Sequence, residues 1–258
     1  MKFRIMCAGI GAIPVRIDAF DGNIASAYID KAEVGFRWDS TLNSKFDTKC
    51  VVSHAIPLTP SERGCIASHI HAWKLIARTA DSPMISSCGS ADWHIFEQIY
   101  GHCLPLRSRE CEDRGKWWYI ICEDDAAIVS RNIVHNFQYS LRRIVEALPT
   151  DCDICYLGHI IASAGIRKKS MYRLFLKPSY LWQMHAYMLT PNSAKRLLTH
   201  LPVNDPVDNF IARLIYEGKI EVNEFCDIVV EYIFIVYCRP TLLETNFLNS
   251  PPTYAKGD

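Results

Sequence analysis

The chain has 258 residues, and its 28 Lys and Arg balance its 28 Asp and Glu, so the formal net charge at pH 7 is zero. This balance argues against nucleic acid or an anionic membrane surface as a partner, because both attract basic proteins. Residues 228–238, the most apolar stretch, are only half the roughly 20 residues that a membrane-spanning helix needs. We expect one globular domain over residues 1–258, with no membrane span and no nucleic-acid partner.

The cysteines number eleven and are spread through apolar segments. An odd count without an Asn-x-Ser/Thr sequon is unlike the disulfide framework of a small secreted protein. The pattern favours reduced thiols and a cytoplasmic location. The one Cys-x-x-Cys pair, Cys152 and Cys155, lies in a strand-like run and is expected to pack in the core rather than perform redox chemistry.

The first predicted helix begins with a capping box, in which Thr59 is the N-cap, Pro60 takes the first helical position and Glu62 lies three residues after the cap. Apolar residues follow at helical spacing, at Ile66, Ile70, Trp73 and Ala77. Residues 80–115 contain many glycine, proline, serine and charged residues, and they predict a long surface excursion.

Strands and helices alternate over the rest of the chain, which favours an α/β fold. Buried strands are predicted at residues 117–122, 153–157, 186–189 and 228–237, and an amphipathic helix at residues 132–148. Thr190 with Pro191 starts a third helix. Asp205 with Pro206 starts a fourth, for which Asp205 is the expected N-cap and Gly218 lies just past the end.

Three consecutive carboxylates, Glu123, Asp124 and Asp125, directly follow the buried strand at residues 117–122. Ligands of open α/β sheets bind at the carboxyl ends of strands, and clustered acids there favour a bound divalent cation. Alternation along an extended chain would turn Glu123 and Asp125 towards the metal and Asp124 the other way. A solvated turn, or a helix N-terminus that favours acids, is the alternative interpretation.

Three further side chains are candidates for the same site. His69 lies near the buried side of the first helix, where packing and hydrogen bonding inside a pocket are both open. Asp208 is either an acid of a first helical turn or a general base aimed into a cleft. His185 precedes a strand, and packing is the simpler role for it.

Six segments together resemble glycosyltransferase family 25, the family of the bacterial lipooligosaccharide and the collagen galactosyltransferases. They are RIDAFDG (16–22), LTPSERGCIASHIHAWK (58–74), YIICEDDAAI (119–128), CDICYLG (152–158), HAYMLTPNSAKRLL (185–198) and PVDNFI (206–211). They cover almost the whole chain in the family's order. The helix with E-x-G-C-x-x-S-H-x-x-x-W, followed by E-D-D, is the most specific part.

This resemblance implies a Rossmann-like GT-A fold, Mn²⁺ or Mg²⁺, and a UDP-sugar donor, usually UDP-galactose or UDP-glucose. The expected activity is inverting transfer of the hexose to a glycan or another hydroxyl acceptor. Carried over by position, Glu123 and Asp125 hold the metal, and Asp208 and His69 are catalytic. The residues assigned to the donor are Asp124, Glu62, Ser68 and His185.

The chain also departs from the family pattern. The family's first strand has no counterpart at the start of the chain, so the strand is expected to be absent or the start truncated, and residues 80–115 are longer than the family's usual link. Two alternatives stay open. The missing strand motivates a truncated, non-catalytic relative that acts as a binding module. The clustered acids after a strand would also suit a metal-dependent phosphohydrolase or nucleotidyltransferase.

Overall fold

The structure is a computed structural model. It describes residues 17–23, 29–44, 53–79, 106–107, 117–123, 126–128, 141, 144–149, 151–161, 168–169, 175–177, 181–225 and 236–238. The predictions for Asp124, Asp125 and the start of the chain lie outside these residues, as does most of the predicted excursion.

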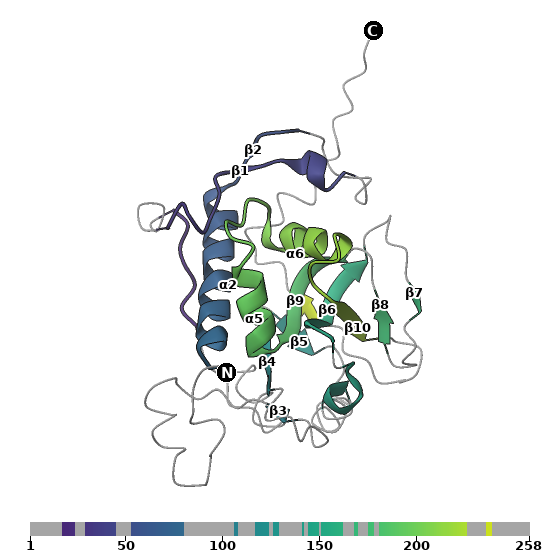
Figure 1. The fold of residues 1–258 in the computed structure, drawn as a ribbon. Helices are drawn as coiled ribbons and strands as arrows, with labels where there is room; N and C mark the ends of the chain where they lie inside the picture. Colours follow the sequence, from purple (N-terminus) through teal and green to yellow (C-terminus); the bar gives the residue numbers. More distant parts are fainter. Residues whose placement is uncertain are drawn as a thin grey trace.

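A seven-stranded sheet forms the centre of the molecule (Figure 1). In spatial order its strands are β3 (Leu106–Arg107), β4 (Trp117–Cys122), β9 (Leu181–Leu189), β6 (Ile154–Ile161), β10 (Val222–Phe225), β8 (Phe175–Lys177) and β7 (Lys168–Lys169). Strand β9 is antiparallel to both β4 and β6, whereas β10 is parallel to β6. Strands β4, β6 and β10 therefore run in the same direction, with β9 reversed between the first two.

Two small sheets complete the strand inventory of the described residues. Strand β1 (Arg37–Trp38) pairs antiparallel with β2 (Ile56–Pro57), and the 3-10 helix η2 (Ser40–Leu42) follows β1. Strand β5 (Ala126–Ile128) pairs antiparallel with β11 (Val236–Cys238). Strand β11 is the only described part of the strand predicted at residues 228–237. Strand β3 is the only described part of the predicted excursion, and it pairs with β4.

Helices α2 (Pro60–Arg78), α5 (Pro191–Leu198) and α6 (Val207–Tyr216) pack on one face of the sheet (Figure 1). The capping box of α2 is confirmed, because the Glu62 N–H donates to Thr59 Oγ1 at 3.2 Å and Glu62 Oε2 accepts the Thr59 N–H at 2.6 Å. The cap of α5 is also confirmed, because Thr190 Oγ1 accepts the Ser193 N–H at 3.1 Å. Local sequence signals thus fix both helix starts.

Alternation along the strands separates two hydrophobic clusters. The first joins the three helices to one face of the sheet, and its large members include Ile66, Ile70, Trp73, Tyr119, Tyr156, Tyr187 and Phe210. The second lies on the other face, and its members include Trp118, Leu141, Ile144, Cys152, Cys155 and Met188. Cys152 and Cys155 are buried members of the second cluster, which confirms the prediction that this pair packs in the core.

The start of α6 corrects one prediction. Its N-cap is Pro206, with no side-chain capping bond, and Asp205 accepts a hydrogen bond from Arg213 Nε at 2.8 Å instead. Asp205 is buried, so a cationic partner two turns along the helix outweighs the local capping preference. The predicted end is confirmed. Gly218 follows the C-cap with a φ of 68°, in the left-handed region that favours glycine.

The predicted α/β class is confirmed as a mixed α/β fold whose described strands pair mostly antiparallel. The GT-A-type arrangement stays a prediction. Among the described residues, no helix combines the length and the apolarity that crossing a bilayer requires.

Candidate functional site

Three side chains with metal-ligating atoms meet where α2 faces the end of β4. They are Cys65, His69 and Glu123, and one ligand atom from each lies within 4.8 Å of the others. Cys65 and His69 are four residues apart on α2, which places them on neighbouring turns of one helix face. Glu123 directly follows the last residue of β4. We call these three residues the Glu123 cluster.

Strand β9 holds Glu123 in place from the side. The pairing of Cys122 with Ala186 continues one residue further, where the Glu123 N–H donates to the His185 carbonyl oxygen at 3.0 Å. The side chains of the same two residues also meet, with His185 Nδ1 3.3 Å from Glu123 Oε2. The buried His185 therefore contacts the acid directly, and its assignment to the donor stays a prediction.

His69 is buried beneath the cluster and bonds to the sheet. Its Nδ1 lies 2.8 Å from the Tyr187 hydroxyl, which also accepts a hydrogen bond from Trp73 Nε1 at 2.9 Å. Burial lowers the pKa of His69 below 6.5, and the charge of Glu123 only partly opposes this shift. His69 is therefore a neutral imidazole at pH 7, the form that can bind a metal or accept a proton.

The pKa of the Cys65 thiol reflects its burial and the negative charges around it. Burial raises its pKa to about 12, followed in order of effect by the charges of Glu123, Asp208 and Glu62. The raised pKa keeps the thiol protonated at neutral pH, which argues against a nucleophilic cysteine.

Asp208 reaches this site from a distant part of the chain. It lies in the first turn of α6, where its Oδ1 accepts the Asn209 N–H at 2.9 Å, and its charge acts on the Cys65 thiol of α2. Of the residues singled out from the sequence, His69 and Glu123 therefore lie beside Cys65 and His185 contacts Glu123. The charges of Asp208 and Glu62 act on the Cys65 thiol.

Glu62 and Ser68 have structural roles that need no ligand. Glu62 Oε2 accepts hydrogen bonds from the backbone and the hydroxyl of Thr59. The Ser68 hydroxyl accepts the Phe20 N–H at 2.9 Å and donates to the Gly64 carbonyl at 2.8 Å. These bonds account for both side chains as parts of the α2 scaffold, whereas their predicted donor-binding role stays untested.

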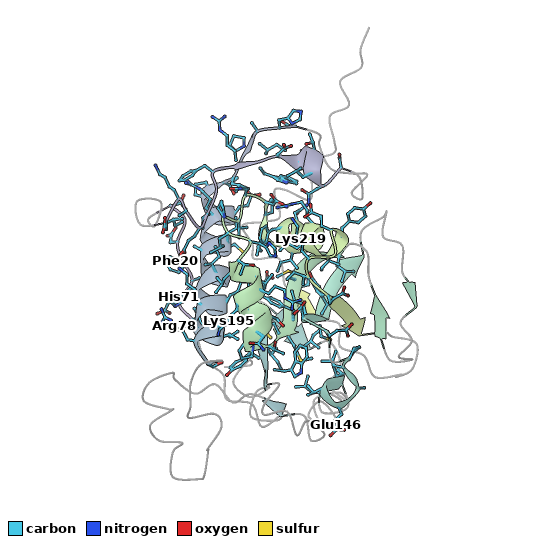
Figure 2. All side chains as sticks on the ribbon, viewed as in Figure 1. Phe20, His71, Arg78, Glu146, Lys195 and Lys219 are labelled. Carbon is cyan, nitrogen blue, oxygen red and sulfur yellow. The ribbon has the colours of Figure 1, made fainter. Side chains whose placement is uncertain are left out.

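The segment around Phe20 lies directly against α2. A Cβ added to Gly64 would lie 2.4 Å from the Phe20 carbonyl oxygen, so only glycine permits this approach. Phe20 also packs edge-on against His71, a residue of α2, with ring centroids 5.9 Å apart (Figure 2). Gly22 of the RIDAFDG segment and Gly64 of α2 both lie in this close contact, so packing accounts for both glycines.

The cluster fits a divalent cation in two respects. The charges of Glu123, Asp208 and Glu62 each raise the pKa of the Cys65 thiol, so a cation bound beside this thiol would meet negative charge. Glu123 offers oxygen, which Mn²⁺ and Mg²⁺ prefer, and neutral His69 offers nitrogen. For His69 to bind through Nε2, its Nδ1–H must donate to the Tyr187 oxygen, an arrangement that the 2.8 Å separation permits.

Sequence reasoning missed Cys65 and Tyr187 as members of the site. The spacing of Cys65 and His69 by four residues on one helix was the available signal for the first. Tyr187 had no local signal, because its contact with His69 depends on how β9 pairs with β4 beneath α2.

No protein-family model matches the chain, and no curated protein matches it. Function must therefore be inferred from the Glu123 cluster and from the sequence resemblance.

Proposed function

We propose that the chain transfers a hexose, galactose or glucose, from a UDP-sugar to a glycan or another hydroxyl acceptor, with a divalent metal and with inversion. One observation carries the proposal. Metal-ligating atoms of Cys65 and His69 on α2 and of Glu123 after β4 lie within 4.8 Å of one another, and His185 of β9 contacts Glu123. The charge of Asp208 on α6 also acts on the Cys65 thiol.

The position of the cluster in the fold supports the proposal. Strands β4, β6 and β10 run in one direction, and Glu123 lies at the carboxyl end of β4. In α/β sheets this edge is where nucleotides and other ligands bind. The arrangement is compatible with the GT-A-type domain that the resemblance implies.

Metal binding is assigned to Glu123 together with Asp125, which lies outside the described residues. His69 is the described side chain that can add a nitrogen ligand. A bound Mn²⁺ or Mg²⁺ supplies positive charge that neutralises the diphosphate as it leaves. His185, in contact with Glu123 Oε2, orients the carboxylate for this role.

Asp208 is the proposed general base. It accepts the proton of the acceptor hydroxyl while the hydroxyl oxygen forms a bond to the anomeric carbon, and the bond from that carbon to UDP breaks. Attack from the face opposite the leaving group inverts the configuration, as in inverting glycosidases. The N-terminus of α6 favours the charged form of Asp208, which the step requires. His69 is the second candidate for the base.

The test is UDP release from UDP-galactose and UDP-glucose by the purified chain, with and without Mn²⁺. We expect release only with the metal, and a loss of about 10²-fold or more in Glu123→Gln, in the range of one charged catalytic group. Glu146→Gln is the matched control, since Glu146 is exposed on a helix that packs against the other face of the sheet (Figure 2).

Each contrary outcome points to a specific alternative. Release of phosphate or UMP instead of UDP would indicate the phosphohydrolase or nucleotidyltransferase class. Binding of UDP-sugar without any turnover, across a panel of acceptors, would indicate a non-catalytic binding module. Metal-dependent turnover that survives Glu123→Gln would remove the Glu123 cluster from the mechanism.

A further inference from the structure

The donor atoms of the Glu123 cluster are of three chemical kinds. Cys65 offers sulfur, His69 offers nitrogen and Glu123 offers oxygen, and one such atom from each residue lies within 4.8 Å of the others. Mn²⁺ and Mg²⁺ prefer oxygen ligands, whereas Zn²⁺ binds sulfur, nitrogen and oxygen alike. The mixed donor set therefore favours zinc over the two metals named for the proposed transferase.

The spacing of the donor atoms is close to that of a tetrahedral site. Zn²⁺ lies about 2.0–2.3 Å from its ligands, which sets neighbouring ligand atoms roughly 3.3–3.8 Å apart. The 4.8 Å limit of the cluster exceeds this spacing by about 1 Å. Cys65 and Glu123 both keep exposed surface, which leaves their side chains room to rotate over that distance.

Two of the three side chains are oriented by further contacts. His69 Nδ1 lies 2.8 Å from the Tyr187 hydroxyl, so Nε2 is the ring nitrogen that remains for a metal. The Tyr187 oxygen can accept two hydrogen bonds, one from Trp73 Nε1 and one from His69 Nδ1–H. Glu123 is held by His185, whose Nδ1 lies 3.3 Å from Oε2. Outer contacts of this kind are typical of metal sites, because they fix the ligands that the metal binds.

The charges of the cluster also suit a dication. A Cys65 thiolate and the Glu123 carboxylate together balance Zn²⁺, while His69 binds as a neutral ring. The raised pKa of the free thiol does not exclude this arrangement, because a coordinating thiol loses its proton to solvent as the metal–sulfur bond forms.

We propose that the Glu123 cluster binds Zn²⁺ through Cys65 Sγ, His69 Nε2 and a carboxylate oxygen of Glu123, with the fourth position open. Three protein ligands and one open position are a common zinc arrangement. Bound Zn²⁺ would occupy Glu123 in place of the Mn²⁺ or Mg²⁺ of the transferase, so it should inhibit transfer. That inhibition rests on the proposed function, whereas zinc binding does not.

The test uses Co²⁺ as a spectroscopic probe of the zinc site, added to the full chain without nucleotide. A cobalt–thiolate bond absorbs in the near ultraviolet, and we expect one equivalent of Co²⁺ to produce this band and one equivalent of Zn²⁺ to remove it. Cys65→Ser should abolish the band, and Cys65→Ser and His69→Gln should each weaken Zn²⁺ binding by about 10²-fold or more. Loss of an outer contact alone typically costs about 10–100-fold in metal affinity.

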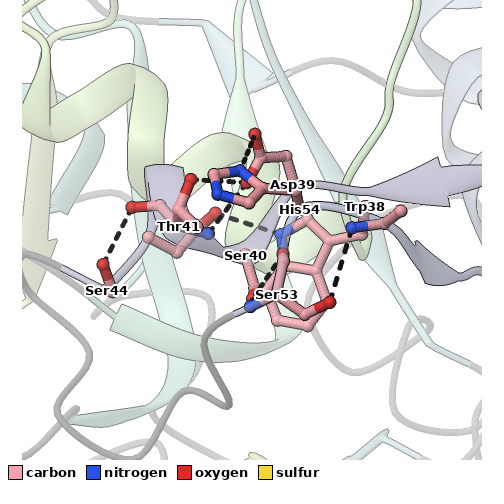
Figure 3. Close-up of polar contacts among 9 residues, drawn as sticks. Trp38, Asp39, Ser40, Thr41, Ser44, Ser53 and His54 are labelled. Atoms are coloured by element: carbon pink, nitrogen blue, oxygen red, sulfur yellow. Dashed lines mark hydrogen bonds and ion pairs between the residues drawn. The ribbon is translucent and has the colours of Figure 1, made fainter.

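Two variants are the matched controls, and both should keep the cobalt band. Cys122→Ala removes a thiol next to Glu123 that packs against the hydrophobic cluster on the other face of the sheet. His54→Gln removes an exposed imidazole whose Nδ1 lies 3.4 Å from Asp39 Oδ2 (Figure 3). Among the described residues, no third cysteine, histidine or acidic side chain joins this pair within 4.8 Å.

The proposal is overturned if the folded chain gives no cobalt–thiolate band, if Cys65→Ser or His69→Gln keeps the zinc affinity of the unchanged chain, or if a folded control variant loses the band. A cobalt band that depends on Cys65, in a chain that releases no UDP from a UDP-sugar, would contradict the transferase and support the zinc site. Metal-dependent release of UDP without a cobalt band would do the reverse.

Discussion

The Glu123 cluster and the buried pair of Asp205 with Arg213 place carboxylates in different electrostatic surroundings. Asp205 is buried and forms an ion pair with Arg213. At the cluster, the charges of Glu123, Asp208 and Glu62 raise the pKa of the Cys65 thiol. Two aspartates only three residues apart, Asp205 and Asp208, thus differ in their surroundings. The first already has a cationic partner, whereas the surroundings of the second favour an added cation.

The largest effect on stability should come from breaking the buried ion pair of Asp205 with Arg213. Arg213→Leu leaves Asp205 as a buried charge without its cation, which typically costs about 3–5 kcal/mol. Urea unfolding measures this loss. Lys219→Ala is the control, because the pair of Lys219 with Glu217 is about half exposed and should contribute less than about 1 kcal/mol. Equal losses in the two variants would show that Asp205 is not held by Arg213.

The next effect concerns catalysis at the cluster. Asp208→Asn keeps the shape of the side chain and removes its basicity, so turnover should fall by about 10²-fold, while UDP and Mn²⁺ affinity stay close to normal. Asp151→Asn, at an exposed position, is the matched control. If Asp208→Asn retains turnover and Asp205→Asn abolishes it, the two aspartates have been assigned to the wrong sites.

A smaller effect is expected beneath the cluster. Tyr187→Phe removes the hydroxyl that meets His69 Nδ1 and Trp73 Nε1, and leaving buried polar groups without this partner should cost about 1–3 kcal/mol. Tyr216→Phe, on a ring that is 51% exposed, should change the unfolding free energy little. Thermal and urea unfolding compare the two variants. A loss no larger in Tyr187→Phe than in Tyr216→Phe would contradict the hydrogen-bond network.

The smallest effect is a pH dependence on the α6 side of the molecule. Burial lowers the pKa of His200 below its ordinary 6.5, and the charges of Lys219 and Arg213 add to the shift. The unfolded chain therefore binds a proton more readily than the folded chain, so the unfolding free energy should fall as pH falls below 6.5. In His200→Gln this part of the slope should disappear. An unchanged slope would exclude His200 as its source.

Local sequence signals were enough to predict the helices. Thr59 with Glu62 and Thr190 with Pro191 fix helix starts within a few residues, and the apolar spacing behind Thr59 identified the core face of α2. Asp205 shows where such signals fail. Its position before Pro206 favours capping, but the buried partner Arg213 lies two turns further along, where no local rule applies.

The candidate site was only partly predictable for the same reason. Glu123 was identified because acids follow a buried strand, and Asp208 was identified from the resemblance. The contact of His69 with Tyr187 depends on the pairing of β9 with β4, in which Tyr187 lies opposite Ile121, 66 positions earlier in the chain.

The most direct test of the central claim is a calorimetric titration of UDP into the full chain, with and without Mn²⁺. If the Glu123 cluster holds the metal of a UDP-sugar transferase, UDP should bind only in the presence of Mn²⁺. Glu123→Gln should then abolish this metal-dependent heat, whereas Glu146→Gln should retain it. UDP binding that is the same without Mn²⁺, or that survives Glu123→Gln, would contradict the account.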